Sequence, residues 1–277
     1  MISINPLDLF FWTFRRNEKD VVNLYTSLSP VMQLATGGSM LNFGLWSQNH
    51  LDPISAQKNL CQVFADMAEL SSGMSVVDVG SGLSAPSKLW RDTYDDLKLY
   101  DVNINFKQLI FSGSEKNIEF LNSTSTKLPF KNDSTDRVLA LESAQHFKPI
   151  SDFILESKRI LKPSGLLALA VPVASKHSTF RDMGLLKFTW SSEHYDVDYL
   201  KTLLSSTGFT ISEEKLIGSN VYEPLANYYL ENRAKLRTAI LKNYPSYVET
   251  ILFKSIQKMK KASESKIIDY VLLKCHL

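Results

Sequence analysis

The sequence predicts an α/β fold built on a doubly wound sheet with a helical lid. Between about 74 and 175, short apolar runs rich in β-branched residues alternate with segments of helical period, which is typical of a parallel sheet with crossover helices. A glycine-rich turn at 80–82 follows the first of these runs. A long stretch of helical spacing, at about 222–265, interrupts the strand pattern near the C-terminus.

Seven segments are predicted to be strands because they combine short apolar runs with turn residues at their ends. In chain order they are Ser75 to Val79, Lys98 to Val102, Ile118 to Asn122, Arg137 to Leu141, Leu166 to Val171, Phe209 to Ile217 and Ile267 to Lys274. The spacing of the first five favours a doubly wound sheet.

Two of the predicted helices are marked by signals at their ends. Asp52 and Pro53 supply an N-cap and a first-turn proline for an amphipathic helix over 54–64 that leads to the first strand. A second helix, over 151–161, is stopped by the Lys-Pro-Ser-Gly segment at 162–165.

The C-terminal part adds a helix over 196–206 and the stretch 222–265, which has no strand signal. We expect the latter to form a helical lid inserted over one end of the sheet. The expected organisation is an N-terminal helical cap segment over 1–50 and one α/β domain over 51–277 with the lid inserted at about 222–265, since 277 residues suit one large domain.

The composition excludes several classes of protein. The chain has 31 basic and 29 acidic residues, for a net charge of +2. It therefore lacks the excess of positive charge that is typical of nucleic-acid-binding proteins. Its two cysteines and five histidines are too few for a disulfide framework or a cysteine-based zinc site. No clustered ligand pattern is present, so we expect no metal, and a cytoplasmic location is the default.

An apolar run at 9–14 precedes the basic pair Arg15 and Arg16. This order is wrong for a signal peptide, and the run is too short to span a membrane. We expect it to pack onto the domain; binding to a membrane surface or closing over a substrate are the alternatives.

The turn after the first strand has the form Gly80-x-Gly82-x-x-Ala85, in which small residues let the backbone approach a ligand at a helix N-terminus. Asp78 lies two residues before the first glycine. Its carboxylate would repel a pyrophosphate, which argues against NAD and FAD. A cofactor with a cationic end, such as S-adenosylmethionine with its ammonium and sulfonium groups, is favoured instead.

Asp101 ends the second predicted strand, about 20 residues after the turn. An acidic group at this distance binds ribose hydroxyls in nucleotide-binding βαβ units. We therefore expect Asp101 and its neighbour Val102 at the ribose; capping the next helix is the alternative role for Asp101.

The third crossover contains a polar cluster at 122–126 followed by Leu128-Pro129-Phe130. Such a segment provides hydrogen-bonding atoms on one side and apolar walls on the other. An adenine ring fits that description.

Taken together, these motifs resemble the class I S-adenosylmethionine-dependent methyltransferases. That family has an acidic-x-Gly-x-Gly turn, an acidic second-strand end and an Asp-Ala-x-x-Leu-Pro-Phe segment in this order. The small-molecule branch is most similar: tocopherol C-methyltransferases, sarcosine and dimethylglycine N-methyltransferases, and natural-product sugar O-methyltransferases. The segments 37–46 and 161–167 extend the resemblance over nearly the whole chain. It implies a Rossmann-like sheet of seven strands whose last strand is antiparallel.

The resemblance also implies roles for individual residues. The turn residues would hold the methionine end of the cofactor, Asp101 the ribose, and Thr124 and Ser125 the adenine, while Tyr25 would close over the cofactor. The expected cofactor-binding set is Tyr25, Asp78, Gly80, Ser81, Gly82, Asp101, Val102, Thr124, Ser125 and Glu142.

Three positions depart from the family pattern. Thr124 stands where the family usually has Asp, which would make the bond to the adenine amino group neutral and weaker. Asn42 replaces a His of the upstream motif, and Thr135 replaces a Phe before the fourth strand.

His146 is the expected general base. It ends the segment Leu141 to His146 after the fourth strand, at the edge where open α/β sheets bind ligands, and it aligns with the second His of the Glu-Ser-x-His-His segment in the sugar O-methyltransferases. An imidazole can take a hydroxyl proton as the oxygen attacks a methyl group. His177 and His194 are secondary candidates. The alternative is that His146 only orders a loop, because methyl transfer to a neutral amine needs no base.

The sequence therefore predicts methyl transfer from S-adenosylmethionine to a small, apolar or ring-containing organic acceptor, first of all at a hydroxyl. An N- or C-methyltransferase acting on an amine, quinone or isoprenoid-like acceptor is one alternative. A non-catalytic S-adenosylmethionine-binding regulatory protein is another. We expect no nucleic-acid partner and no integral membrane association, and the sequence does not define the oligomeric state.

Overall fold

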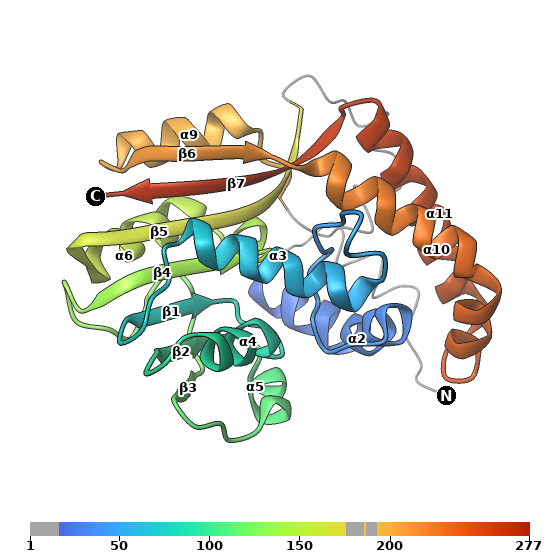
Figure 1. The fold of residues 1–277 in the computed structure, drawn as a ribbon, viewed down its shortest axis with the longest axis horizontal. Helices are drawn as coiled ribbons and strands as arrows, with labels where there is room; N and C mark the ends of the chain where they lie inside the picture. The colour runs from blue at the N-terminus through green and yellow to red at the C-terminus, as the bar shows by residue number, and fades with distance from the viewer. Residues whose placement is uncertain (1–16, 176–185, 187–192) are drawn as a thin grey trace.

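A computed structural model describes residues 17–175, 186 and 193–277 of the chain. Its centre is a seven-stranded sheet of order β3-β2-β1-β4-β5-β7-β6 (Figure 1). The strands are β1 (Ser75–Val79), β2 (Lys98–Val102), β3 (Ile118–Leu121), β4 (Thr135–Leu141), β5 (Leu161–Ala174), β6 (Thr210–Leu216) and β7 (Ile268–His276). β7 runs antiparallel to both of its neighbours, and the other paired strands are parallel. The predicted α/β sheet with an antiparallel last strand is confirmed.

The bounds of β1 and β2 agree with the prediction, whereas β5 is longer than the predicted 166–171. The segment expected to be a connecting loop, 162–165, lies within β5, where Leu161 pairs with Thr135 and Leu166 with Arg137. Gly165 permits this irregularity, because a Cβ there would meet the carbonyl oxygen of Lys162 at 2.8 Å.

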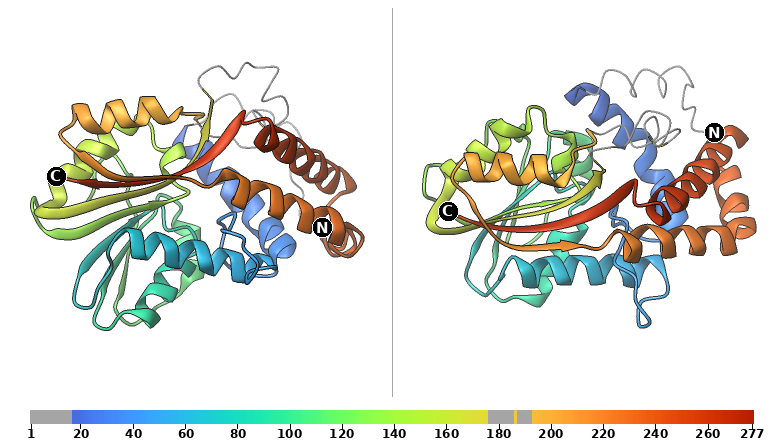
Figure 2. Two further views of the ribbon diagram at one scale, coloured as in Figure 1. Left: turned by 45° about the horizontal axis from the view of Figure 1, so that its top comes forward. Right: turned by 90° about the horizontal axis from the view of Figure 1, so that it is seen from above.

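Helices cover both faces of the sheet (Figure 2). On one face lie α3 (Pro53–Met67), α4 (Ala85–Thr93) and α5 (Phe106–Ser112); on the other lie α6 (Ile150–Ile160) and α9 (Val197–Ser206). The first core includes Leu60, Phe64 and Trp90, all 0% exposed, and the second includes Phe153 and Leu200, also 0% exposed. The sheet is therefore buried on both sides, and ligands reach it at its edges.

Three further helices lie at the carboxyl end of the parallel strands: α2 (Glu18–Thr36), α10 (Gly218–Leu241) and α11 (Ser246–Glu264) (Figure 1). The last two form an antiparallel pair between β6 and β7, which confirms the predicted helices over 222–265. Leu24 and Val31 of α2 pack in a small core with Ile240 and Tyr244. This core fixes α2 above the sheet edge.

The division of the chain at residue 50 stays a prediction, and the apolar run at 9–14 lies outside the described residues. Within the part of the chain that the structure describes, no helix is long and apolar enough to cross a membrane.

Candidate active site

A pocket lies where the strand order reverses. β1 sits between β2 and β4, and the chain leaves β1 toward β2 and β3 before it returns to β4 on the other side. Open α/β sheets bind ligands at such a point, beyond the carboxyl ends of the strands. The pocket is lined by the turns after β1, β2 and β4, by the loop after β3 and by α2.

The glycine turn forms the floor of this pocket through Gly80, Ser81 and Gly82, all of which line it as predicted. Gly80 has a φ of 80°, and a Cβ on it would lie 2.4 Å from Cβ of Ser143. The Ser143 hydroxyl donates to the carbonyl oxygen of Val79 at 2.6 Å. The turns after β1 and β4 are thus packed together so closely that only glycine fits.

Two buried polar atoms of the pocket lining lack a hydrogen-bond partner in the structure. They are the hydroxyl oxygen of Ser81 and the amide oxygen of Asn42, on side chains that are each 6% exposed. Buried polar atoms are normally paired. A ligand with polar groups at this position, such as the amino-acid end of S-adenosylmethionine, would satisfy them, so the lining fits that cofactor.

Asp78 and Asp101 do not line the pocket, which differs from the direct contacts expected of them. They are 2% and 0% exposed and lie side by side on β1 and β2, where the Ser87 hydroxyl is 3.3 Å from Asp78 Oδ2 and 2.6 Å from Asp101 Oδ1. Burial raises the pKa of Asp101 to about 6, and burial together with Asp101 raises that of Asp78 well above its usual value. Both carboxyl groups contact Ser87 of α4 and are absent from the pocket lining.

Asn103, two residues after Asp101, lines the pocket beside the predicted Val102. Its Nδ2 donates to the carbonyl oxygen of Gly82 at 3.1 Å and to Oε1 of Gln108 at 3.0 Å. Gln108, which also lines the pocket, donates to the Ser29 hydroxyl at 3.2 Å. The sequence analysis missed both residues, although the two-residue period of the strand places Asn103 on the same side as Asp101, just past the strand end.

The loop after β3 contributes Ser123 and the predicted Ser125 to the lining. Thr124 is not part of it, contrary to its expected place beside the adenine: its hydroxyl donates to the Glu18 carboxylate on α2. Glu18 itself lines the pocket and was not predicted. Ser123 and Ser125 thus line the pocket, whereas the Thr124 side chain between them is taken up by Glu18.

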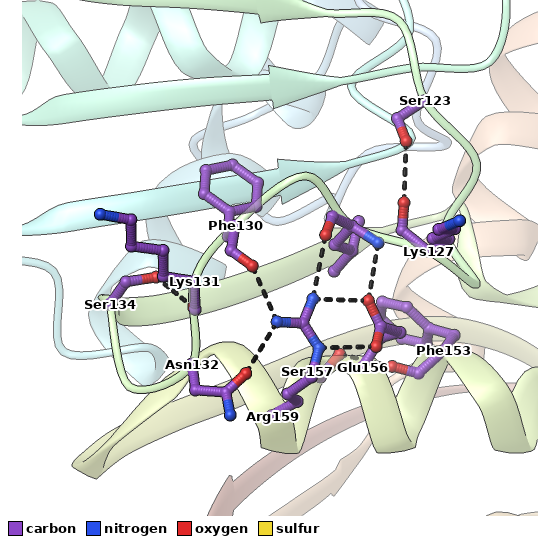
Figure 3. A network of polar contacts seen from close by, with 11 residues as sticks. Ser123, Lys127, Phe130, Lys131, Asn132, Ser134, Phe153, Glu156, Ser157 and Arg159 are labelled. Carbon is purple, nitrogen blue, oxygen red and sulfur yellow. Dashed lines mark hydrogen bonds and ion pairs between the residues drawn. The ribbon is translucent and has the colours of Figure 1, made fainter.

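Two charged residues of α6 hold this loop in place (Figure 3). Arg159 donates to the carbonyl oxygens of Phe130 and Leu128 at 2.7 and 2.9 Å, and Glu156 accepts from the backbone of Leu128 at 2.7 Å. Arg159 and Glu156 also pair with each other at 2.7 Å. The Leu-Pro-Phe segment is therefore anchored from outside the pocket.

The predicted residues Tyr25 and His146 meet at one side of the pocket, which both of them line. The Tyr25 hydroxyl lies 2.8 Å from His146 Nε2, and the two rings are nearly perpendicular at 88°. Burial and the nearby Glu142 raise the pKa of Tyr25, so the phenol stays protonated. A neutral phenol and an imidazole form a hydrogen-bonded pair there.

Glu142, also predicted, lines the pocket next to this pair. It has a left-handed backbone with a φ of 53°. Its Oε1 accepts from the backbone of Phe43 at 2.9 Å and from the Tyr270 hydroxyl at 3.0 Å. Burial nevertheless raises its pKa to about 8, so the carboxyl is largely protonated at neutral pH.

Of the secondary candidates, His177 lies outside the described residues and His194 does not line the pocket. Among the residues that the structure describes, no group of three or more His, Cys, Asp or Glu side chains could hold a metal ion.

Comparison with known proteins agrees with this geometry. Residues 77–169, from β1 to β5, match the family model described as methyltransferase domain. The chain is an S-adenosylmethionine-dependent methyltransferase. S-adenosylmethionine is its cofactor, and the glycine turn lies within the matched region.

Among curated proteins, this methyltransferase is 27% identical to erythromycin 3''-O-methyltransferase of Saccharopolyspora erythraea over 241 residues, which cover 79% of this chain and 78% of that protein. Two solved structures share its fold. The 4+2 cyclase SpnF has a TM-score of 0.78 at 17% identity, over 94% of this chain and 95% of its own. A putative sarcosine dimethylglycine methyltransferase from Galdieria sulphuraria has a TM-score of 0.76 at 13% identity, over 89% and 97%. At these identities the two structures establish the fold alone.

Proposed function

We propose that this methyltransferase transfers the methyl group of S-adenosylmethionine to a hydroxyl group of a small organic acceptor, with His146 as general base. The observation that carries the proposal is the position of His146 Nε2: it lies at the edge of the cofactor pocket, 2.8 Å from a hydroxyl oxygen. A hydroxyl is therefore accommodated at this nitrogen with the geometry that proton transfer requires.

The proton balance explains why a base is useful. The cofactor supplies an electrophilic methyl group, and an acceptor hydroxyl that takes this group must lose its proton. A neutral imidazole can accept that proton as the new carbon–oxygen bond forms. Glu142 is the other titratable group at this side of the pocket, and its raised pKa, about 8, leaves it mostly protonated at neutral pH. His146 is the better acceptor of the proton.

Tyr25 acts as a positioning residue in this proposal. Its hydroxyl holds the His146 ring in the absence of acceptor, and the acceptor hydroxyl exchanges for it at Nε2. Because the pKa of Tyr25 is raised, the phenol does not compete with His146 for the proton. Tyr25 belongs to α2, so its exchange is coupled to the helix that covers the pocket.

The cofactor is proposed to be held by the residues that line the pocket. The glycine turn, Ser81 and Asn42 would receive the amino-acid end, because the unpaired polar atoms of the lining lie there. Asn103 and Gln108 would bind the ribose in place of Asp101. Ser125 would lie beside the adenine.

The acceptor class is supported by a curated relative that matches 79% of this chain and 78% of its own length. That protein is named a 3''-O-methyltransferase, and the O-methyl assignment here follows its name together with the His146 geometry.

A methyl-labelled cofactor tests this proposal. The protein would be incubated with labelled S-adenosylmethionine and a panel of hydroxyl-bearing glycosides and macrolactones, each matched to an analogue with an amine in place of the hydroxyl. We expect label in a hydroxyl compound, and about 100-fold less of it with His146→Ala. Transfer to amines only, unaffected by His146→Ala, would contradict the proposal.

A further inference from the structure

The two buried carboxyl groups behind the glycine turn are not explained by the methyl-transfer step. Asp78 and Asp101 are direct partners in the parallel register of β1 and β2, and each is nearly inaccessible, at 2% and 0% exposure. Asp101 Oδ2 is buried without a hydrogen bond in the structure, and the neighbouring Ser84 hydroxyl, which is also unpaired, acts on the same carboxyl and lowers its pKa. Two carboxyl groups in such proximity, without solvent, cannot both ionise easily.

Ser87 is the group that joins them. Its hydroxyl oxygen is 2.6 Å from Asp101 Oδ1 and 3.3 Å from Asp78 Oδ2. A hydroxyl has one proton to donate, so it serves one carboxylate, and the shorter distance assigns that proton to Asp101. The contact with Asp78 is then satisfied only if the Asp78 carboxyl carries a proton and donates to the Ser87 oxygen.

The other elements around the pair supply little compensating charge. In α4, Lys88 lowers the pKa of Asp101 from a distance, but its ion pair is with Glu115 at 2.8 Å. In α3, the group facing Asp78 is the Cys61 thiol, which burial keeps neutral by raising its pKa. The strand partners on the outer sides, Leu139 of β4 and Phe120 of β3, are apolar. Among the described residues, no cation forms an ion pair with either carboxylate.

The pair lies directly behind the wall of the cofactor pocket. Asp78 is two residues before Gly80, and Asp101 precedes Val102; both of these residues line the pocket. Charges buried in the protein are screened weakly by salt. A cation in the pocket will therefore stabilise the doubly ionised state of the pair.

We propose that Asp78 and Asp101 share one proton and release it to solvent when S-adenosylmethionine binds, so that the site prefers this cofactor over S-adenosylhomocysteine. Before binding, the pair carries one negative charge and the free cofactor one positive charge. After binding, the pair carries two negative charges, which the bound cofactor and the released proton balance. Methyl transfer removes the sulfonium charge. The pair then takes up a proton again, so the protein binds the product S-adenosylhomocysteine less tightly than S-adenosylmethionine.

The pKa values agree with this exchange. Asp101 ionises first, with a pKa of about 6, and the pKa of Asp78 is raised further by burial and by the negative charge of Asp101. The second proton is therefore held more tightly than the first. The inference concerns the cofactor alone and does not depend on which acceptor is methylated.

Calorimetric titration of the full-length protein tests the inference. S-adenosylmethionine and S-adenosylhomocysteine would each be titrated at pH 7 in two buffers with different enthalpies of ionisation, because the difference between the buffers gives the protons released per ligand. For the native protein we expect release of about 0.3 protons or more with S-adenosylmethionine, and less than half of that with S-adenosylhomocysteine.

The variant Asp78→Asn mimics the protonated state, since its amide can donate to the Ser87 oxygen while Ser87 donates to Asp101. We expect this variant to release less than half as many protons as the native protein with S-adenosylmethionine and to lose about 3- to 10-fold of the preference for that ligand. Asp101→Asn is the second variant, with the same expectation, should Asp78→Asn not fold.

Glu142→Gln tests the competing source of the proton, because Glu142 itself lines the pocket and its raised pKa makes it a second carboxyl that a bound cation can ionise. The part of the release that depends on Asp78 should remain in it. The inference is wrong if the native protein releases no proton, if Asp78→Asn and Asp101→Asn release as much as the native protein, or if Glu142→Gln abolishes the release.

Discussion

The Tyr25 hydroxyl lies 2.8 Å from His146 Nε2, across 121 positions of sequence. This contact joins α2 to the turn after β4, and so it links the helix that covers the pocket to the residue proposed to move the proton. Substitutions of His146 and of Tyr25 therefore test separately how each residue contributes to kcat.

Replacing His146 removes the base and leaves the glycine turn intact. We expect His146→Ala to lower kcat by about 100-fold or more, with the affinity for S-adenosylhomocysteine changed less than threefold. Steady-state kinetics with calorimetric titration measure both. A variant with native kcat would show that positioning alone carries the reaction.

Removing only the hydroxyl of Tyr25 tests whether it positions His146 or relays the proton. Tyr25→Phe keeps the ring and loses one hydrogen bond, so we expect kcat to fall by about 3- to 10-fold. A loss as large as that of His146→Ala, measured in the same assay, would mean that the proton passes through Tyr25 and that the exchange proposed here is wrong.

The raised pKa of Glu142 makes stability depend on pH. An acid whose folded-state pKa is raised stabilises the protein below its unfolded value and loses that contribution as the pH rises toward its folded value, here from 4.5 to about 8. Glu142→Gln keeps an acceptor oxygen for Phe43 and Tyr270. We expect it to match the native protein near pH 4.5 and to exceed it by about 1–3 kcal/mol above pH 8.

Chemical denaturation at several pH values measures this difference. The exposed Glu119→Gln is the control and should show no such trend. A Glu142→Gln variant whose advantage does not grow with pH would contradict the assigned protonation state.

The close packing of Gly80 on Ser143 predicts a large cost for any side chain there. Gly80 and Gly73 both have a φ of 80°, but a Cβ on Gly80 would meet Ser143 at 2.4 Å whereas one on Gly73 would meet nothing within 4 Å. Gly73→Ala should therefore cost about 1 kcal/mol from backbone strain, and Gly80→Ala about 2–4 kcal/mol. Equal losses in denaturant unfolding would rule out the clash.

The sequence was sufficient for the sheet and the glycine turn, and it singled out Tyr25 and His146, which the structure brings together at one pocket. Strand periodicity and turn residues are local signals, and they placed β1 and β2 with correct bounds. The pocket-lining glycines followed from the same turn motif.

Two of the expected site residues, Asp101 and Thr124, do not line the pocket because of neighbours that a local pattern does not show. Asp101 lies within β2, where Ser87 of α4 contacts it. Asn103, beyond the strand end, reaches the pocket. The Thr124 hydroxyl donates to Glu18, which is 106 positions away in the sequence. A local sequence pattern cannot predict such a contact.

The most direct test of the site is a calorimetric titration with S-adenosylhomocysteine of the native protein, Asn103→Ala and Asp101→Asn at one pH. The account predicts binding to the native protein, at least about tenfold weaker binding to Asn103→Ala, and binding to Asp101→Asn within about threefold of native. Absence of binding to the folded native protein, or a loss in Asp101→Asn as large as that in Asn103→Ala, would contradict the placement of the cofactor between the glycine turn and Asn103.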